Sequence, residues 1–194
     1  MLLNILKQIN WVDILVLIIF VRVCYVAAKD GFPIELFKFT GTVTAVYLSL
    51  HYYIALSDYL IKWLSLGERL PLEFLQFIVF LVLACVGYYI FVLLRSIFSR
   101  FITMEAVSTL NKWGSLLLGI ARAMMLSSLI IFMLVISSAG YFKSSVKASY
   151  MSKHLFLIAP GTYSWLWKSV TSKFATSEKY NEAVVSINEE LSKP

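Results

Sequence analysis

The sequence has few charged residues and few residues that interrupt helices. Only 14% of its 194 residues are charged, and it contains 4 prolines, 2 cysteines and 2 histidines. Soluble domains carry about 25% charged and about 45–50% apolar residues, whereas this chain is 60% hydrophobic with a mean hydropathy of +0.80. A core of this size could not hide so much apolar surface. The sequence therefore predicts an integral membrane protein.

Motifs for catalysis, metals and nucleic acids are absent as well. The chain has no H-E-x-x-H, no G-x-S-x-G and no glycine-rich phosphate loop, and no span carries the deep carboxylate pair of an intramembrane aspartyl protease. Two distant histidines and the lone cysteines Cys24 and Cys85 favour no metal or cofactor, and we expect both cysteines to be small buried hydrophobes. The net charge of +6 is scattered between apolar stretches, which argues against nucleic acid. We expect a protein that is not an enzyme.

Four apolar stretches are long enough to cross a bilayer as helices, since a span needs about 20 residues. None shows the period-two alternation of a barrel strand. Arg22 lies inside the first stretch, so we expect an uncleaved span rather than a signal peptide. The predicted fold is an all-α bundle of four transmembrane helices, at about 11–28, 36–56, 74–94 and 113–136.

The connections between these spans differ in character. Residues 29–35 predict a tight turn, 57–73 a mixed-charge loop, and 95–112 an amphipathic helix lying in the headgroup region before the fourth span. Residues 155–167 are apolar but too short to span, which favours docking at the interface, and the polar tail after them is expected in solvent. We therefore divide the chain into a membrane domain, 1–138, and a C-terminal interfacial segment and tail, 139–194. Tryptophans at span ends predict interface anchors at Trp11, Trp63 and Trp113.

Charged residues inside the bilayer are the first candidate site. Arg22 and Arg122 lie about 10–15 Å from the same membrane face, where an unpaired charge is costly. We expect Glu35 to pair with Arg22, Arg122 or both; the alternative is that both arginines extend to the headgroups. For Asp13 a position at the water boundary suffices without a partner, and for His51 interface anchoring is favoured over a proton relay or metal binding.

Small residues form a second pattern. In the fourth span they recur at every fourth position, which places them on one helix face and lets a neighbouring backbone approach closely. The second span repeats this spacing once. The predicted packing positions are Gly41, Ala45, Ser115, Gly119, Ala123 and Ser127.

Three short motifs resemble the bacterial colicin V production protein family. The family begins its first span with Asn-Trp-x-Asp, which Asn10, Trp11 and Asp13 match. An Arg-Gly-Phe-x-x-Glu-like run follows near the first turn, and "DGFPIELFKFTG" supplies Gly31, Phe32, Glu35 and Gly41.

The third motif precedes and enters the fourth span. There the family has roughly Leu-Asp-Arg-x-x-Gly-x-x-x-Gly-x-x-Arg-Gly. The corresponding stretch "LNKWGSLLLGIARA" keeps Leu110, Gly119 and Arg122. It replaces the acid by Asn111, the arginine by Lys112, the first glycine by Ser115 and the last by Ala123. The resemblance covers roughly residues 8–136, with a weaker echo at 155–167.

This resemblance implies a four-span protein of the bacterial inner membrane, linked to colicin V production or export and to envelope homeostasis. A similar four-span unit anchors a periplasmic serine protease in some bacteria, which favours both termini outside the cytoplasm. Basic residues are nearly balanced between the two sides, but Arg95, Arg100 and Lys112 cluster beside span ends, which agrees with cytoplasmic first and third loops.

Two functions remain open. The first is a non-enzymatic assembly or accessory factor in toxin export and envelope homeostasis, whose partners are the bilayer and either a second copy or other envelope and export proteins. The second is an oligomeric transport or channel component, in which Arg22, Glu35 and Arg122 line a polar path.

Overall fold

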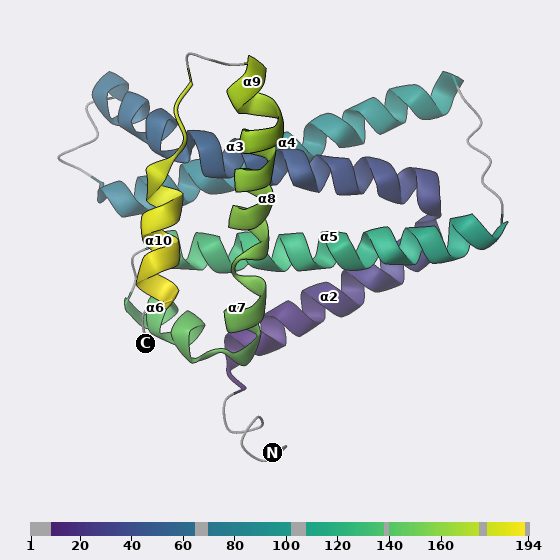
Figure 1. The fold of residues 1–194 in the computed structure, drawn as a ribbon, viewed down its shortest axis with the longest axis horizontal. Helices are drawn as coiled ribbons and strands as arrows, with labels where there is room; N and C mark the ends of the chain where they lie inside the picture. Colours follow the sequence, from purple (N-terminus) through teal and green to yellow (C-terminus); the bar gives the residue numbers. More distant parts are fainter. Residues whose placement is uncertain (1–8, 65–69, 102–107, 138–139, 175–177, 193–194) are drawn as a thin grey trace.

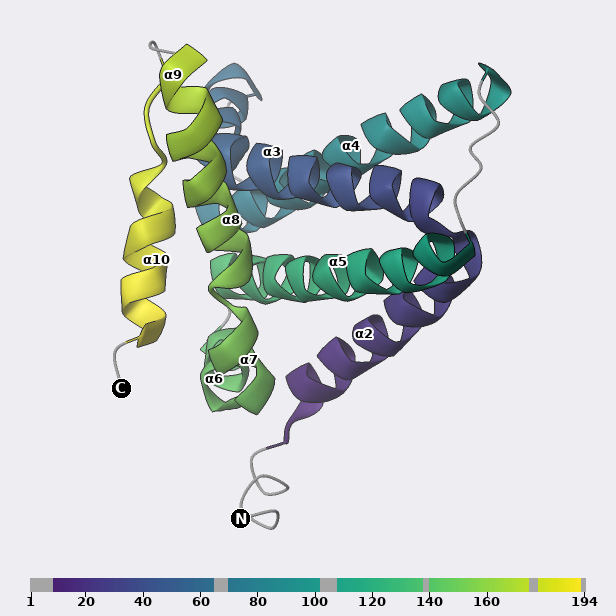
Figure 2. The same cartoon turned by 45° about the vertical axis from the view of Figure 1, so that its right-hand side comes forward.

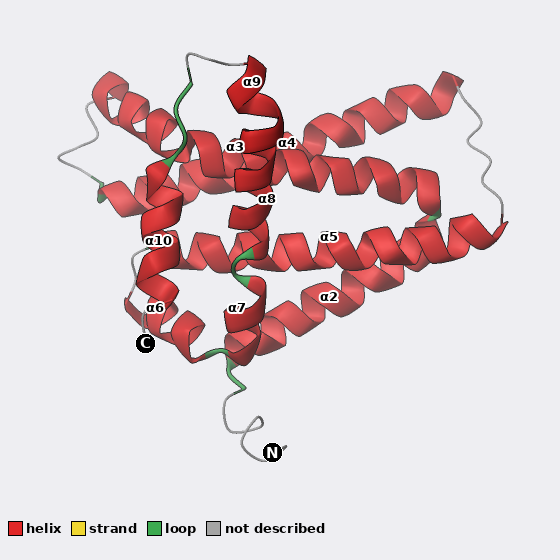
Figure 3. Ribbon diagram, viewed as in Figure 1, coloured by secondary structure: helices red, strands yellow, loops and turns green. Residues whose placement is uncertain are grey.

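The protein is almost entirely helical. The computed structural model describes residues 9–64, 70–101, 108–137, 140–174 and 178–192, and those ranges contain no strand (Figure 3). The long helices are α2 (Trp11–Asp30), α3 (Phe32–Leu64), α4 (Leu72–Phe101) and α5 (Ser108–Ile136). The shorter elements are α6 (Gly140–Ala148), α7 (Tyr150–Leu155), α8 (Ile158–Leu166), the π-helical η2 (Trp167–Thr171), α9 (Ser172–Phe174) and α10 (Glu182–Ser192).

The four long helices form a bundle in which α5 is the most enclosed (Figure 1). α3 and α4 run antiparallel and pack along their lengths. They approach closely at Gly87, where an added Cβ would lie 2.7 Å from the Ala45 Cα, and at Gly41, where one would lie 3.0 Å from the Phe91 Cβ. The small residues of the second span therefore pack against α4 of the same chain.

Three helices are long and apolar enough to cross a membrane: Trp11–Asp30, Leu72–Phe98 and Asn111–Ile136. The predicted second span is helical but does not join them, because threonines and other polar side chains dilute its hydropathy. Five of these hydroxyl side chains donate to the backbone carbonyl four residues earlier in α3: Thr40, Thr42, Thr44, Ser49 and Ser57.

A C-terminal arm, residues 140–174, crosses the bundle. Its elements α7, α8 and η2 run roughly perpendicular to α3 and α5 (Figures 1 and 2). They cross nearer to the end of the bundle at which α2 begins and α5 ends (Figure 1). Ser128 of α5 joins the arm where α7 gives way to α8, since its hydroxyl donates to the Phe156 carbonyl and accepts from the Ala159 amide. The rings of Phe80, Phe132 and Phe156 stack beneath this crossing, with centroids 5.8 Å apart at each step.

Several predicted connections are shorter than expected, because the helices extend through them. Only Gly31 separates α2 from α3, so Glu35 belongs to a helix rather than to a turn. Helix α3 continues to Leu64, into the predicted loop at 57–73. Most of the predicted interfacial helix at 95–112 belongs to the end of α4 and the start of α5, and its remainder, 102–107, lies outside the described residues.

Two further expectations were wrong. The C-terminal tail was expected in solvent, but α10 packs on the molecule with Val184 fully buried. Cys85 is exposed on α4 and Cys24 is only partly buried, so neither is a core residue. The division into domains at residue 138 stays a prediction.

Candidate functional site

An ion pair between Glu35 and Arg122 lies inside the bundle. The Arg122 Nε lies 2.6 Å from the Glu35 Oε1, and the two side chains are 6% and 0% exposed. Glu35 stands in the first turn of α3 and Arg122 at the middle of α5. The helices thus bring together an acid and a base that are 87 positions apart in the sequence.

This contact is electrostatic rather than a well-aligned hydrogen bond. Among the described residues, neither carboxylate oxygen of Glu35 has a hydrogen-bond partner, and neither does the Arg122 Nε. The attraction between the two charges therefore has to offset the cost of removing both from water. Removing one partner from such a pair leaves an uncompensated buried charge.

Small residues make room for the ion pair. A Cβ added to Gly119 would lie 2.3 Å from the Ala27 Cβ of α2 and 3.8 Å from the Glu35 Oε1. The other small positions of α5, Ser115, Ala123 and Ser127, are all fully buried. The stripe of small residues therefore packs within the chain, against α2 and beside Glu35.

The turn before Glu35 is held by Asn111. Its Oδ1 accepts a 2.7 Å hydrogen bond from the Phe32 amide, the first amide of α3. Gly31 has a φ of +79°, and a Cβ there would lie 2.5 Å from the same oxygen. Asn111 stands where the motif that the sequence resembles has an acid, and its amide oxygen supplies the acceptor that a carboxylate would supply.

The other predicted charge, Arg22, does not join this site. Its side chain is exposed on α2, and no described residue forms an ion pair with it. Lys38 instead pairs with Asp30 across the α2–α3 turn. Two ion pairs, Asp30–Lys38 and Glu35–Arg122, therefore lie near this turn.

Asp13 lies at the opposite end of the bundle and anchors the arm. It is 4% exposed, its Oδ2 accepts from the Asn10 amide, and its Oδ1 accepts from the Ser149 hydroxyl and the Met151 amide at 2.7 and 2.8 Å. The prediction that Asp13 needs no partner was wrong, because α7 folds back onto the start of α2. The only sequence signal was Asn10-x-x-Asp13, a capping box that accounts for one of these bonds.

His51 joins the arm and the tail to α3. Its Nδ1 lies 2.9 Å from the Tyr163 hydroxyl, and its Nε2 lies 2.9 Å from the Glu178 Oε2. Tyr52 donates to the other Glu178 oxygen at 2.7 Å, and the Asn181 Nδ2 donates to the Leu50 carbonyl at 2.7 Å. We call these residues, His51, Tyr52, Tyr163, Glu178 and Asn181, the tail latch. Sequence reasoning missed it, because no local pattern links His51 to Glu178.

Contacts and burial in the tail latch shift the pKa values of two of its members that lie outside the spans, Glu178 and Tyr163. Hydrogen bonds from Tyr52 and His51 hold the pKa of the Glu178 carboxyl below its ordinary value of 4.5. Burial raises the pKa of the Tyr163 hydroxyl, which therefore stays protonated near neutral pH. Glu178 is accordingly ionised and the latch holds a charge-assisted contact.

The three predicted anchors lie in different surroundings. Trp63 and Trp113 are 69% and 67% exposed, which suits side chains that face lipid headgroups. Trp11 is partly buried and stacks on Tyr141 of α6, with ring centroids 6.2 Å apart. Trp11 thus packs on the arm in the folded chain.

The described residues contain no group of three or more His, Cys, Asp or Glu side chains that could hold a metal ion. Two cavities with apolar linings lie beside the arm, of about 380 Å³ between α2 and α7 and about 590 Å³ between α3, α5 and α8. Glu35 and Arg122 line neither cavity.

Comparison with known proteins assigns the family. The model of the colicin V production protein family matches residues 12–160, well over half of the chain, from the start of α2 into α8. No curated protein and no solved structure matches. The matched part includes the Glu35–Arg122 ion pair and the Asp13 anchor, whereas Tyr163, Glu178 and Asn181 of the tail latch lie beyond it. This multi-pass membrane protein therefore belongs to the colicin V production protein family.

Proposed function

We propose that the protein is a non-enzymatic accessory factor of the bacterial inner membrane that supports colicin V production or export and envelope homeostasis. The observation that carries this proposal is that the buried charges pair with each other. Glu35 and Arg122 neutralise each other in a close-packed junction, and Arg22 lies apart from them. A transport component would need those charges along a polar path.

The proposal includes α3 as a fourth span. Helix α3 starts where α2 ends, and it runs antiparallel to α4 along the bundle (Figure 1). If α2, α4 and α5 cross the bilayer, α3 has to return the chain across it. Its hydroxyl side chains donate within the helix, which satisfies them in lipid.

The packing within the chain also limits which surfaces could bind a partner. The small residues of α3 and α5 are used within the chain, so a second copy or an export protein would have to contact another surface. The exposed apolar face of α4, which includes Val82, Tyr89 and Leu93, is available for lipid or for such a contact. Crosslinking from Val82→Cys and Leu93→Cys in a Cys24→Ser, Cys85→Ser background tests whether this face meets another protein.

A paired substitution separates the two functions. We expect Glu35→Met with Arg122→Met to keep the fold, because a buried ion pair can be replaced by apolar residues of similar volume at little cost. An accessory factor should then still restore colicin V release and dye exclusion to cells that lack the gene. A folded double variant that fails in cells, together with solute flux by the wild type in liposomes, would establish the transport function instead.

Orientation needs its own experiment. The loop residues favour both termini outside the cytoplasm, but the arm adds Lys168 and Lys173 to the face that bears the termini, which favours the opposite orientation. Reporter fusions after residue 194 and within 102–107 should give opposite results, and the pair decides which face is cytoplasmic.

A further inference from the structure

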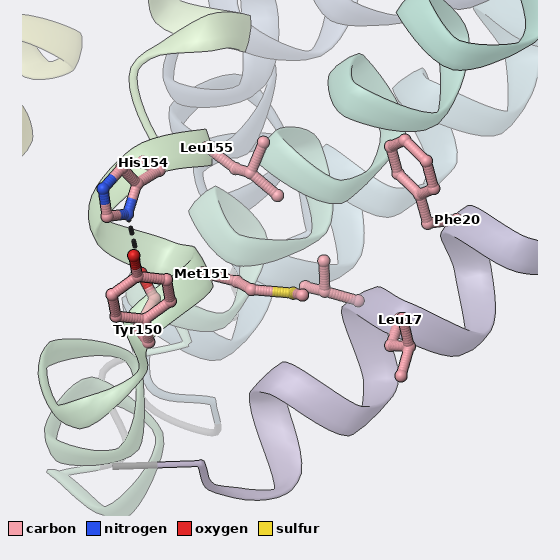
Figure 4. A pocket seen from close by; sticks show the side chains of 7 residues that line it. Leu17, Phe20, Tyr150, Met151, His154 and Leu155 are labelled. Carbon is pink, nitrogen blue, oxygen red and sulfur yellow. Dashed lines mark hydrogen bonds between the residues drawn. The ribbon is translucent and has the colours of Figure 1, made fainter. Parts of the chain in front are cut away.

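A groove between α2 and α7 carries an inference beyond the accessory role. Its volume is about 380 Å³, and its lining is apolar except at one edge. Leu17 and Phe20 of α2 face Met151 and Leu155 of α7 across it, and His154 lies at the outer edge (Figure 4).

The groove lies at a depth that lipid tails reach. Its α2 wall is a candidate membrane span that begins at Trp11, and Leu17 is six residues along it, or about 9 Å. Leu17 is 51% exposed, so the groove is open to the surrounding bilayer. Helix α7 is fixed beside α2 by the bonds from Ser149 and Met151 to Asp13, which makes the groove a fixed feature of the fold.

Two basic residues lie side by side on α7 at this groove: His154 is part of its lining, and Lys153 is its neighbour in the helix. The sequence contains no Asp or Glu between Glu105 and Glu178, and Lys153 and His154 are exposed on α7. Asp13, the acid that is hydrogen-bonded to the start of α7, is buried and already accepts three hydrogen bonds. A negatively charged group at the rim of the groove would therefore lie beside the basic residues Lys153 and His154.

The His154 ring is oriented for such a group. Its Nδ1 lies 3.0 Å from the Tyr150 carbonyl, which can only accept, so Nδ1 carries a proton. The other ring nitrogen, Nε2, is the ring atom left to face a ligand.

We propose that this groove binds an anionic phospholipid, with one acyl chain between α2 and α7 and the headgroup phosphate on Lys153 and His154. The apolar lining selects the chain and the cationic rim selects the charge. The arm is thereby attached to the bilayer by a specific lipid as well as by its contacts with α2.

Native mass spectrometry of the delipidated full chain tests this proposal. Phosphatidylglycerol and phosphatidylcholine with identical acyl chains are titrated separately. We expect one phosphatidylglycerol to bind more tightly than phosphatidylcholine. Lys153→Gln should lower its affinity about fivefold, the effect of about one Lys near an anionic headgroup. Equal affinity for the two lipids would overturn the proposal.

Two pairs of variants locate the site. Leu17→Trp should fill the groove and abolish the bound lipid, whereas Leu117→Trp, on an exposed position of α5, should leave binding unchanged. Lys168→Gln, an exposed lysine of η2, is the matched control for Lys153→Gln. If both lysine variants lose affinity equally, or if Leu17→Trp retains the lipid, the site lies elsewhere and the proposal is wrong.

A soluble competitor distinguishes the lipid from its headgroup. Glycerol phosphate has the same charged group without acyl chains, and we expect it not to displace bound phosphatidylglycerol at millimolar concentration. Displacement would mean that the rim binds phosphate without the groove, which contradicts the proposed role of α2. Circular dichroism of each variant confirms that it is folded before binding is measured.

Discussion

The two ends of the bundle are held together by different kinds of contact. At the end near the α2–α3 turn, small residues bring backbones together around one ion pair, and Asn111 caps the turn. At the other end, large side chains such as Phe80 and Phe132 fill the core, and polar networks at Asp13 and His51 attach segments that follow the bundle. The first end closes the bundle on itself, whereas the second joins it to the arm and tail.

The largest effect should come from breaking the ion pair. Arg122→Met leaves Glu35 buried without a countercharge, which we expect to cost about 3–5 kcal/mol of unfolding free energy. Thermal unfolding in detergent measures this. The double variant Glu35→Met with Arg122→Met should regain most of the loss, and a double variant as unstable as the single one would show that the pairing is not the source of stability.

The close approach at Gly119 should come next. Gly119→Ala places a methyl group against Ala27, and we expect a loss of about 1–3 kcal/mol from overpacking. Adding Ala27→Gly removes the obstructing Cβ and should restore stability. Gly161→Ala is the matched control, because nothing lies within 4 Å of a Cβ at that position; a similar loss there would contradict a packing effect.

At the other end, Asp13→Ala should release the arm without opening the bundle. The Ser149 hydroxyl and the Met151 amide lose their acceptor, which should cost about 1–3 kcal/mol. Hydrogen exchange should accelerate over 145–155 and remain unchanged in the middle of α5. Asp58→Ala, an exposed acid of α3, should change neither, and slow exchange in the Asp13 variant would show that the arm docks without this anchor.

The smallest effect on stability should come from breaking the tail latch, and this effect should depend on pH. Because the Glu178 pKa lies below 4.5 in the folded chain, its contribution is complete above pH 4.5 and is lost as the pH falls through the folded value. A fluorophore on the tail and an acceptor on α4 should therefore separate in acid. Glu178→Gln should remove this pH dependence, and its persistence would assign the change to another group.

The sequence was more informative about the first end than the second. The spacing of Ser115, Gly119 and Ala123 predicts a close helix contact, and the depth of Arg122 points to an acid such as Glu35, because both signals lie within spans whose geometry is regular. Asp13 gave no comparable signal. Its partners Ser149 and Met151 are far along the chain, and only the path of the arm brings them back.

The full lengths of the helices could not be predicted from the sequence either. Turn and charge patterns marked 57–73 and 95–112 as connections, but tertiary packing extended α3 and α4 into them. Hydropathy identified α2, α4 and α5 well, since their side chains face lipid or an apolar core. It was a poorer guide to α3, in which hydroxyl groups are satisfied by the helix itself.

The Asp13 anchor also sets an order for biogenesis. Asp13 emerges from the ribosome well before its partners, because Ser149 and Met151 are synthesised 136 and 138 residues later. Until then the carboxylate has only the capping bond from Asn10. A chain interrupted before residue 149 would insert with this acid lacking its partners on the arm, so the contact distinguishes chains that include the start of α7 from chains that stop before it.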